Sequence, residues 1–232
     1  MCRNVGTYPK SRCNIYGCFY SKWLLLMVLI FDFDGTIADT FKLYIDVMRK
    51  IHHEYNFKYI DNDDIELCRA MTAKEIIQYL GISPLQIPII AHRIRGDFTQ
   101  RMTEQKIFTG FDSVLEGLKQ EGHKLFILSS NSEENINIFL RLNNITQFDA
   151  VFSKSSIFGK SRIIKNIINK NKFIADDVYY IGDETRDIEA AKKISIKSIA
   201  VSWGYNNRKA LIDKNPDYLI DKPQQLMSLF AV

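Results

Sequence analysis

The stretch Phe31–Thr36, with the sequence FDFDGT, directly follows an unbroken apolar run over residues 23–30. A run of this length that ends in acidic residues and a glycine predicts a buried strand that stops at a polar site. Asp32 and Asp34 stand two positions apart, so they share one strand face or turn together into one pocket where the strand ends. Gly35 permits a sharp exit from the strand. An Asp-Gly turn with acidic flanks is the alternative interpretation, and the rest of the chain has to supply partners for the two acids.

The composition is typical of an ordinary globular protein. The chain has 232 residues, enough for one large domain or for a core with a smaller insert. Its formal net charge is +4 and its lysines are scattered, so we expect no nucleic-acid partner. Its 4 cysteines provide neither a zinc-ligand set nor a disulfide framework. These features fit a reduced cytoplasmic protein.

Residues 1–26 are expected to form an N-terminal extension without fixed structure. Residues 1–22 show no clear period and contain Gly6, Pro9 and Gly17. Basic residues precede the apolar run, which raises the alternative of a signal peptide or anchor. The run is too short to span a bilayer, and it continues into the acidic motif without a small-residue cleavage site. We therefore expect no membrane partner.

Helical periodicity follows the acidic motif. Apolar residues recur at helical spacing over residues 41–53 and again over 61–106. Asp39 or Thr40 is expected to cap the first helix, and breakers such as Pro88 are expected to divide the second stretch into short helices. No strand of comparable apolarity interrupts these residues, which predicts a helical block of about seventy residues between the first strand and the next.

The remainder of the chain alternates strands with turns and helices. This alternation predicts an α/β fold with right-handed crossovers and a mostly parallel sheet. The expected strands cover residues 124–128, 148–152, 178–181, 198–201 and 218–220, and the expected helices cover 112–120, 133–142, 161–169 and 186–193.

Polar side chains gather where the predicted strands end. Because ligands bind at the carboxyl edge of an open parallel sheet, these residues are expected to face one crevice. They are Asp32 and Asp34 after the first strand, Ser129 and Ser130 after the second, Lys160 at the start of the helix after the third, and Asp183 and Asp187 after the fourth.

This combination of groups suits phosphoryl transfer. Clustered carboxylates raise one another's pKa unless a counter-charge is present, and a few carboxylates with a substrate phosphate suit Mg²⁺. Lys160 can neutralise phosphate charge, and Ser129 can donate a hydrogen bond to its oxygens. One carboxylate can attack phosphorus to form an aspartyl-phosphate. A second can protonate the leaving alcohol and later deprotonate water.

Four motifs in order make the chain resemble the haloacid dehalogenase superfamily, in its phosphatase branch. The order and spacing agree over residues 27–205. The family's motifs are Asp-x-Asp-Gly-Thr, a Ser or Thr after an apolar strand, a lysine before a helix, and Gly-Asp-x-x-x-Asp. They match residues 32–36, Ser129 with Ser130 as a one-residue slip, Lys160 within residues 158–161, and residues 182–187.

The resemblance implies roles for the acidic residues. Asp32 would be the nucleophile and a metal ligand. Asp34 would be the general acid and base, and its backbone carbonyl would also bind the metal. Asp183 would bind Mg²⁺ directly or through water. Asp187 and Glu184 would lie behind these ligands, with Asp187 steadying Lys160 or a metal-bound water.

The resemblance also implies which residues hold the substrate phosphate: Gly35, Thr36, Ser129, Ser130 and Lys160. Dehalogenases lack an aspartate at the position of Asp34, and the ion-pumping ATPases carry Thr there. The presence of Asp34 therefore disfavours both of these branches.

The helical block resembles the small helical cap of the phosphoglycolate phosphatase and β-phosphoglucomutase subgroup, which closes over the site and selects the substrate. The implied organisation is an extension at 1–26, a doubly wound, Rossmann-like core at 27–39 and 107–232, and an inserted cap at 40–106. Arg69 lies where a cap loop could contact a substrate carboxylate or second phosphate. An ordinary solvated helix face is the alternative for Arg69.

The predicted function is a Mg²⁺-dependent phosphatase of a small phosphorylated metabolite, either phosphoglycolate-like or a sugar phosphate, working through an aspartyl-phosphate as a monomer or homodimer. A phosphosugar mutase of the same superfamily is an alternative outcome of the same chemistry. A non-catalytic binding or regulatory module that kept the fold is another. A phosphonate-cleaving enzyme would need a cap lysine in an apolar setting, which neither Lys58 nor Lys74 has.

Overall fold

The computed structural model describes residues 26–153 and 159–230. The predicted N-terminal extension lies outside the described residues apart from Leu26, and so does Phe158 in the third motif. Within the described ranges, no helix has both the length and the apolar character needed to cross a membrane.

In the described part of the chain, six parallel strands form one sheet, in the order β3-β2-β1-β4-β5-β6. The predicted α/β fold with a parallel sheet is therefore confirmed, and β1 occupies a central position between β2 and β4. The strands are β1 (Val28–Phe31), β2 (Lys124–Ser129), β3 (Ala150–Ser153), β4 (Val178–Gly182), β5 (Lys197–Val201) and β6 (Tyr218–Ile220).

The sheet register determines how long β1 is. Val28 pairs with Lys124 on one side and with Val178 on the other, and both neighbouring strands begin there. Leu26 and Met27, which belong to the predicted apolar run, are not part of the strand, and residues 23–25 of that run lie outside the described residues. Strand β3 starts at Ala150 instead of the predicted residue 148, because its ladder to β2 begins at the pair Phe126–Ala150.

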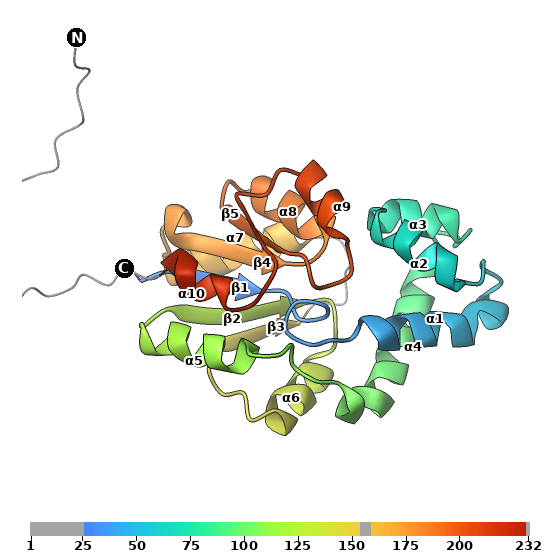
Figure 1. Cartoon of the computed structure of the whole chain (residues 1–232), viewed down its shortest axis with the longest axis horizontal. Coiled ribbons are helices and arrows are strands. Elements are labelled where there is room, and N and C mark those ends of the chain that lie inside the picture. The colour runs from blue at the N-terminus through green and yellow to red at the C-terminus, as the bar shows by residue number, and fades with distance from the viewer. Residues whose placement is uncertain (1–25, 154–158, 231–232) are drawn as a thin grey trace, which may run out of the picture.

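Helices cover both faces of the sheet, as Figure 1 shows. Successive residues of β1 point to opposite faces. Leu29 and Phe31 pack with α5 (Phe111–Gln120), α6 (Glu133–Leu142) and α10 (Gln225–Phe230). Val28 and Ile30 pack with α7 (Lys160–Asn171) and α8 (Thr185–Lys192). This two-sided covering explains why β1 is apolar at every position.

Two short helices were not predicted from the sequence. Helix α9 (Arg208–Asp213) begins after Asn207, whose side chain accepts a hydrogen bond from the Ala210 amide. Helix α10 buries Leu226 and Phe230, four positions apart. Six residues are too few to display a helical period. A single 3-10 turn, η2 (Ala175–Asp177), precedes β4.

The predicted helical block consists of α1 (Phe41–Tyr55), α2 (Asn62–Arg69), α3 (Ala73–Tyr79), α4 (Ile87–Arg101) and the 3-10 turn η1 (Met102–Glu104). Its two connections to the sheet run side by side, since Asp39 N donates to Lys106 O at 2.9 Å and Phe108 N to Ile37 O at 3.2 Å. In Figure 1 the block lies beyond the carboxyl ends of the central strands. The division of the chain into core and cap stays a prediction.

Two details of the helical block differ from expectation. Pro88 lies in the first turn of α4 and does not break a helix, because a proline there has no helical amide to lose. Thr40 precedes α1, but its side chain makes no capping hydrogen bond. The Thr40 hydroxyl lies 3.1 Å from the Tyr205 hydroxyl instead.

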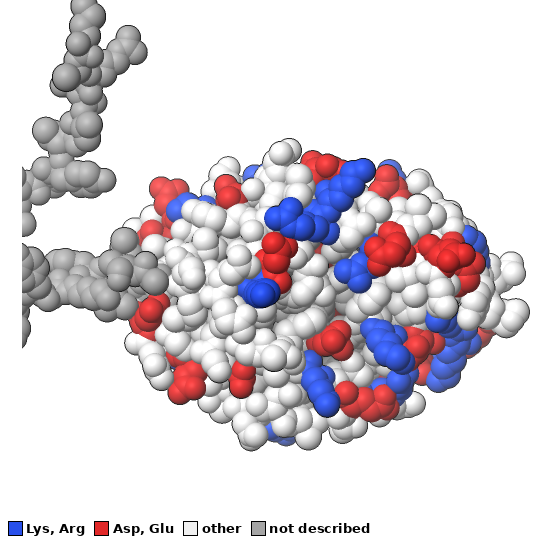
Figure 2. All heavy atoms as spheres, viewed as in Figure 1, with Lys and Arg blue, Asp and Glu red and all other residues white. Residues whose placement is uncertain are grey.

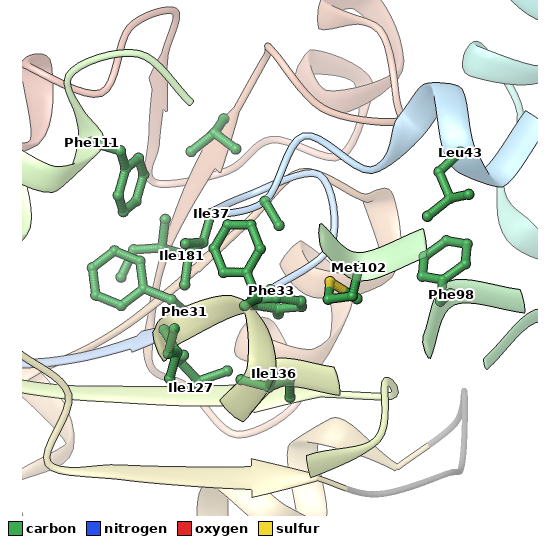
Figure 3. Packing of buried hydrophobic residues seen from close by; sticks show 14 of the residues in the cluster. Phe31, Phe33, Ile37, Leu43, Phe98, Met102, Phe111, Ile127, Ile136 and Ile181 are labelled. Atoms are coloured by element: carbon green, nitrogen blue, oxygen red, sulfur yellow. The ribbon is translucent and has the colours of Figure 1, made fainter. Parts of the chain in front are cut away.

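One apolar cluster connects the sheet to the helical block (Figure 3). Phe31 makes an edge-to-face contact with Phe111, with ring centroids 5.9 Å apart. Phe33 makes a similar contact with Phe139 at 5.1 Å. The cluster continues through Met102 to Phe98 in α4. The acidic motif is therefore held by apolar side chains that alternate with its two carboxylates.

The surface in Figure 2 shows acidic and basic side chains intermixed on the viewed face, with no large area of one sign. This agrees with the scattered lysines of the sequence.

Candidate active site

Asp32 continues directly from the central strand. Its amide donates to Ile181 O at 2.8 Å, which extends the pairing of β1 with β4 by one residue. The residue is 3% exposed. Its Oδ1 accepts a hydrogen bond from the Phe33 amide at 2.8 Å, and its Oδ2 accepts one from Lys160 Nζ at 2.5 Å. Burial raises the pKa of Asp32 to about 6, although Lys160 acts in the opposite direction.

Lys160 lies in the first turn of α7 and bridges the carboxylates of Asp32 and Asp187. Its Nζ lies 2.5 Å from Asp32 Oδ2 and 2.6 Å from Asp187 Oδ1, and the residue is 5% exposed. Burial lowers the pKa of Lys160, but Asp187 and Asp32 outweigh this effect and hold it well above its ordinary value. The lysine is therefore a fixed positive charge, and the sequence-based expectation that Asp187 lies beside it agrees with this geometry.

Asp183 is fully buried where β4 ends. Thr36 Oγ1 donates to its Oδ1 at 2.7 Å, and the Tyr205 amide donates to its Oδ2 at 2.7 Å. Two glycines allow this close approach. A Cβ at Gly35, where φ is +76°, or at Gly204 would lie 2.3 Å from Asp183 Oδ2. Larger residues at either glycine would collide with the carboxylate.

Asp32, Asp183 and Asp187 form a cluster in which one oxygen from each lies within 4.8 Å of the others. Burial, and then the charges of Glu184, Asp32 and Asp187, raise the pKa of Asp183 well above its ordinary value. Such repulsion between buried carboxylates is what a bound cation relieves. Oxygen donors in this number suit a hard divalent ion, so the residues present fit a metal.

The carboxylate cluster contains the predicted ligands Asp32 and Asp183 together with Asp187, which was expected to lie behind the ligands. It includes the Asp187 carboxylate and not that of Asp34. Asp187 Oδ2 also accepts a hydrogen bond from the Glu184 amide at 3.0 Å, so the start of α8 holds it in place. The expectation that Asp34 binds the metal through its backbone carbonyl stays a prediction.

Asp34 faces the helical block and is half-buried. Asn131 Nδ2 donates to both of its carboxylate oxygens, at 3.0 and 3.2 Å. Burial, and then the charge of Asp32, raise the pKa of Asp34 to about 7. A carboxyl with such a pKa can both release and accept a proton near neutral pH.

Apart from Lys160, the predicted phosphate-binding residues lie in two places: Ser129 and Ser130 at the end of β2, and Gly35 and Thr36 in the loop after β1. Ser130 lines the cavity next to Asp34. Ser129 is buried at the end of β2, where its Oγ accepts a hydrogen bond from the Asn131 amide at 3.0 Å. The Gly35 amide donates to Ala38 O at 2.9 Å, and the Thr36 amide donates to Phe33 O at 3.3 Å. Phosphate binding by Gly35 and Thr36 stays a prediction, and these hydrogen bonds give it no support.

Two residues near Asp183 and Asp34 were not selected from the sequence. Asn131 follows Ser129 and Ser130 directly, so its position after a buried strand was the available signal. Arg186 lies inside the fourth motif and pairs with Glu184. Burial lowers the pKa of Arg186, but Glu184 and other carboxylates outweigh this and raise it above its ordinary value.

The loop after β5 also contributes to the site. Asn206 Oδ1 accepts a hydrogen bond from the Thr185 amide at 2.9 Å, and its Nδ2 donates to Arg69 O at 3.0 Å and Met71 O at 2.8 Å. The Arg69 guanidinium lies over the Phe41 ring, 5.1 Å from the centroid. Arg69 lines the cavity that contains Asp34. Its predicted substrate contact stays a prediction.

Comparisons with known proteins identify the family of the chain. Residues 29–201 match the family model described as haloacid dehalogenase-like hydrolase. The chain is 30% identical over 203 residues to a phosphoglycolate phosphatase of Synechococcus elongatus, covering 87% of this chain and 96% of that protein. It is 23% identical to the pyrophosphatase PpaX of Bacillus mycoides, covering 88% and 96%.

A solved structure has a similar fold. A haloacid dehalogenase-like hydrolase of Streptococcus pneumoniae superposes with a TM-score of 0.73 at 20% identity, covering 89% of this chain and 99% of that one.

Proposed function

The chain belongs to the haloacid dehalogenase-like hydrolase family, and we propose that it is a Mg²⁺-dependent phosphatase that hydrolyses a small phosphate monoester through an aspartyl-phosphate. The observation that carries the proposal is the position of Lys160 between Asp32 and Asp187, with Asp183 in the same carboxylate cluster. A nucleophilic carboxylate beside a fixed positive charge and a candidate metal site is the arrangement that attack on a phosphate dianion requires.

In the first step, an Asp32 oxygen attacks phosphorus and forms the aspartyl-phosphate, while the bond from phosphorus to the ester oxygen breaks. Asp34 gives its proton to the departing alcohol oxygen. The pKa of Asp34, raised to about 7, keeps a protonated fraction available for this transfer. Lys160 holds Asp32 in place and offsets part of the phosphate charge.

In the second step, Asp34 takes a proton from water, whose oxygen attacks phosphorus. Inorganic phosphate leaves and the Asp32 carboxylate is restored. Asp32, Asp183 and Asp187 would hold Mg²⁺, which would supply positive charge to stabilise the phosphoryl oxygens.

The sequence resemblance and the name of the Synechococcus relative support phosphoglycolate as one substrate to test. A sugar phosphate is the other substrate class that the sequence predicted. Both are small phosphorylated metabolites.

The proposal is tested by measuring phosphate release from a panel of monoesters as Mg²⁺ is varied. Wild type should hydrolyse at least one ester and lose activity when the metal is chelated. Asp183→Ala should lose both the activity and the response to Mg²⁺. An unaltered Mg²⁺ response in this variant would remove Asp183 from the ligands, and metal-independent hydrolysis by wild type would overturn the proposed cofactor.

A further inference from the structure

A cavity of about 210 Å³ extends from Asp34 into the helical block. At the sheet end its lining includes Asp34, Asn131 and Arg186, which all lie at the carboxyl ends of strands or just beyond them. The described lining beyond this end comes from α1–α4 and the segments that connect them. The cavity therefore joins a proposed catalytic carboxyl to the interior of the helical block.

Apart from Arg69 and Arg95, the helical end of this cavity is lined by apolar side chains. Arg69 and Arg95 are its charged residues among the described lining, and the backbone carbonyl of each accepts a hydrogen bond from a residue outside the helical block. The Arg69 guanidinium lies over the Phe41 ring. Arg69 O accepts a hydrogen bond from Asn206 Nδ2 at 3.0 Å, and Arg95 O accepts one from Asn135 Nδ2 at 3.2 Å. The inner wall is formed by side chains that include Met48, Ile60, Leu80, Ile82, Ile90 and Phe98, each at most 8% exposed.

A polar alcohol would lose free energy in such a space. Each hydroxyl of a sugar would give up hydrogen bonds to water, and aliphatic side chains would provide no replacement. Apolar groups would instead gain free energy by leaving water. The wall therefore discriminates between alcohols by their polarity.

We propose, on the basis of the proposed phosphatase activity, that the alcohol part of the substrate carries an apolar chain that occupies this cavity. Asp34 lines the same cavity, so an ester oxygen that accepts its proton would direct the leaving group toward the helical block. The enzyme then prefers alkyl phosphate monoesters over sugar phosphates and phosphoglycolate.

The chain length of the substrate provides a direct test. Ethyl, propyl, butyl and pentyl phosphate share the same reacting bond, so differences among them report on the chain alone. Burial of one methylene corresponds to roughly a fourfold gain in kcat/KM. We expect such a rise along the series until the cavity is full. Pentyl phosphate should also exceed ribose 5-phosphate, a five-carbon primary ester, by at least about tenfold.

Two substitutions locate the effect in the cavity. Ala91 in α4 lines it, and Ala91→Phe should lower the ratio of kcat/KM for pentyl over ethyl phosphate by about tenfold or more. Ile89 lies on the same helix but outside the lining and is 55% exposed, so Ile89→Phe is the matched control and should keep the ratio. Ile76 also lines the cavity, and Ile76→Ala should enlarge it by shortening this side chain. The alkyl phosphate with the highest kcat/KM should then have a longer chain than the one that wild type prefers.

The outcomes separate this inference from the proposed function. Suppose that ribose 5-phosphate or phosphoglycolate is hydrolysed and kcat/KM does not rise with alkyl chain length. This result would overturn the proposal of an apolar alcohol and leave the proposed phosphatase activity in place. An equal loss of the ratio in Ala91→Phe and Ile89→Phe would also overturn it. If no ester of the panel releases phosphate, both the proposed phosphatase activity and this inference are overturned.

Discussion

Thr36 Oγ1 donates a 2.7 Å hydrogen bond to Asp183 Oδ1, across a sequence separation of 147 positions. Both side chains are fully buried, so the hydroxyl holds a carboxylate that water does not reach. The bond joins the loop after β1 to the loop after β4, and it orients the carboxylate that we propose as a metal ligand.

We expect Thr36→Val, which keeps the shape and removes the donor, to lower the free energy of unfolding by about 1–3 kcal/mol, because a buried carboxylate oxygen loses its partner. The affinity for Mg²⁺ should fall roughly 10–100-fold, as it does when a group that orients a ligand is lost. Urea unfolding and a Mg²⁺ titration of activity measure the two effects. Thr36→Ser keeps the hydroxyl and should retain most of the stability and most of the affinity for Mg²⁺. If Thr36→Ser and Thr36→Val lose stability and affinity equally, the hydrogen bond has no such role.

Asp32→Asn should abolish turnover, lowering kcat by roughly 10⁴-fold or more, because a neutral amide cannot serve as the nucleophile. Phosphate release with the best ester of the panel measures this loss. Circular dichroism should show an unchanged fold, since Lys160 keeps its contact with Asp187 at 2.6 Å. Activity close to that of wild type in a folded variant would exclude Asp32 as the nucleophile.

Asn131→Asp should lower kcat by about 10–100-fold with a smaller change in KM. The new carboxylate keeps an oxygen to accept from the Ser132 amide and Asn135 Nδ2, both at 2.8 Å. It can no longer donate the two hydrogen bonds that position the Asp34 carboxylate. Steady-state kinetics separate the two constants. A change in KM alone would place Asn131 in substrate binding and not in the orientation of Asp34.

The helical block provides a test of stability against pH. Lys58 and Tyr79 hydrogen-bond the Asp64 carboxylate and lower its pKa from 3.8 to about 2. Because the folded pKa lies below the unfolded one, the carboxylate stabilises the fold above about pH 4, and this contribution is lost as pH falls toward 2. Asp64→Asn should therefore unfold more easily than wild type at pH 7, and the difference should shrink on acidification.

Urea unfolding at a series of pH values measures this difference. Asp63→Asn is the matched control, because Asp63 is the preceding residue of α2 and is exposed. It should change stability little at any pH. A difference between Asp64→Asn and wild type that stays constant down to pH 2 would contradict the ion pair as its source.

The order of strands and helices could be predicted from the sequence because each element carries its own local signal. The apolar run before Asp32, the similar runs before Ser129 and Asp183, and the helical spacing between them are properties of single segments. The meeting of Asp32, Lys160 and Asp183 also followed, since parallel strands bring their carboxyl ends to one edge of the sheet.

Only the tertiary structure decided which groups touch at that edge. The Tyr205 amide and the Thr36 hydroxyl both donate hydrogen bonds to Asp183. Asn131 Nδ2 donates to Asp34 across a sequence separation of 97 positions. These contacts depend on loop conformations, which no periodic pattern encodes. The length of β1 likewise depended on where its neighbours begin.

The cavity shows the same limit. Helical periodicity identifies Met48 and Leu80 as residues that turn away from solvent, but it does not say what they face. In the folded chain they face a space that opens at Asp34. The sequence by itself determined the fold and the chemistry of its strand ends, because both arise from local patterns. The partners of each carboxylate and the surroundings of the leaving group arise from packing between distant segments, and only the tertiary structure decided them.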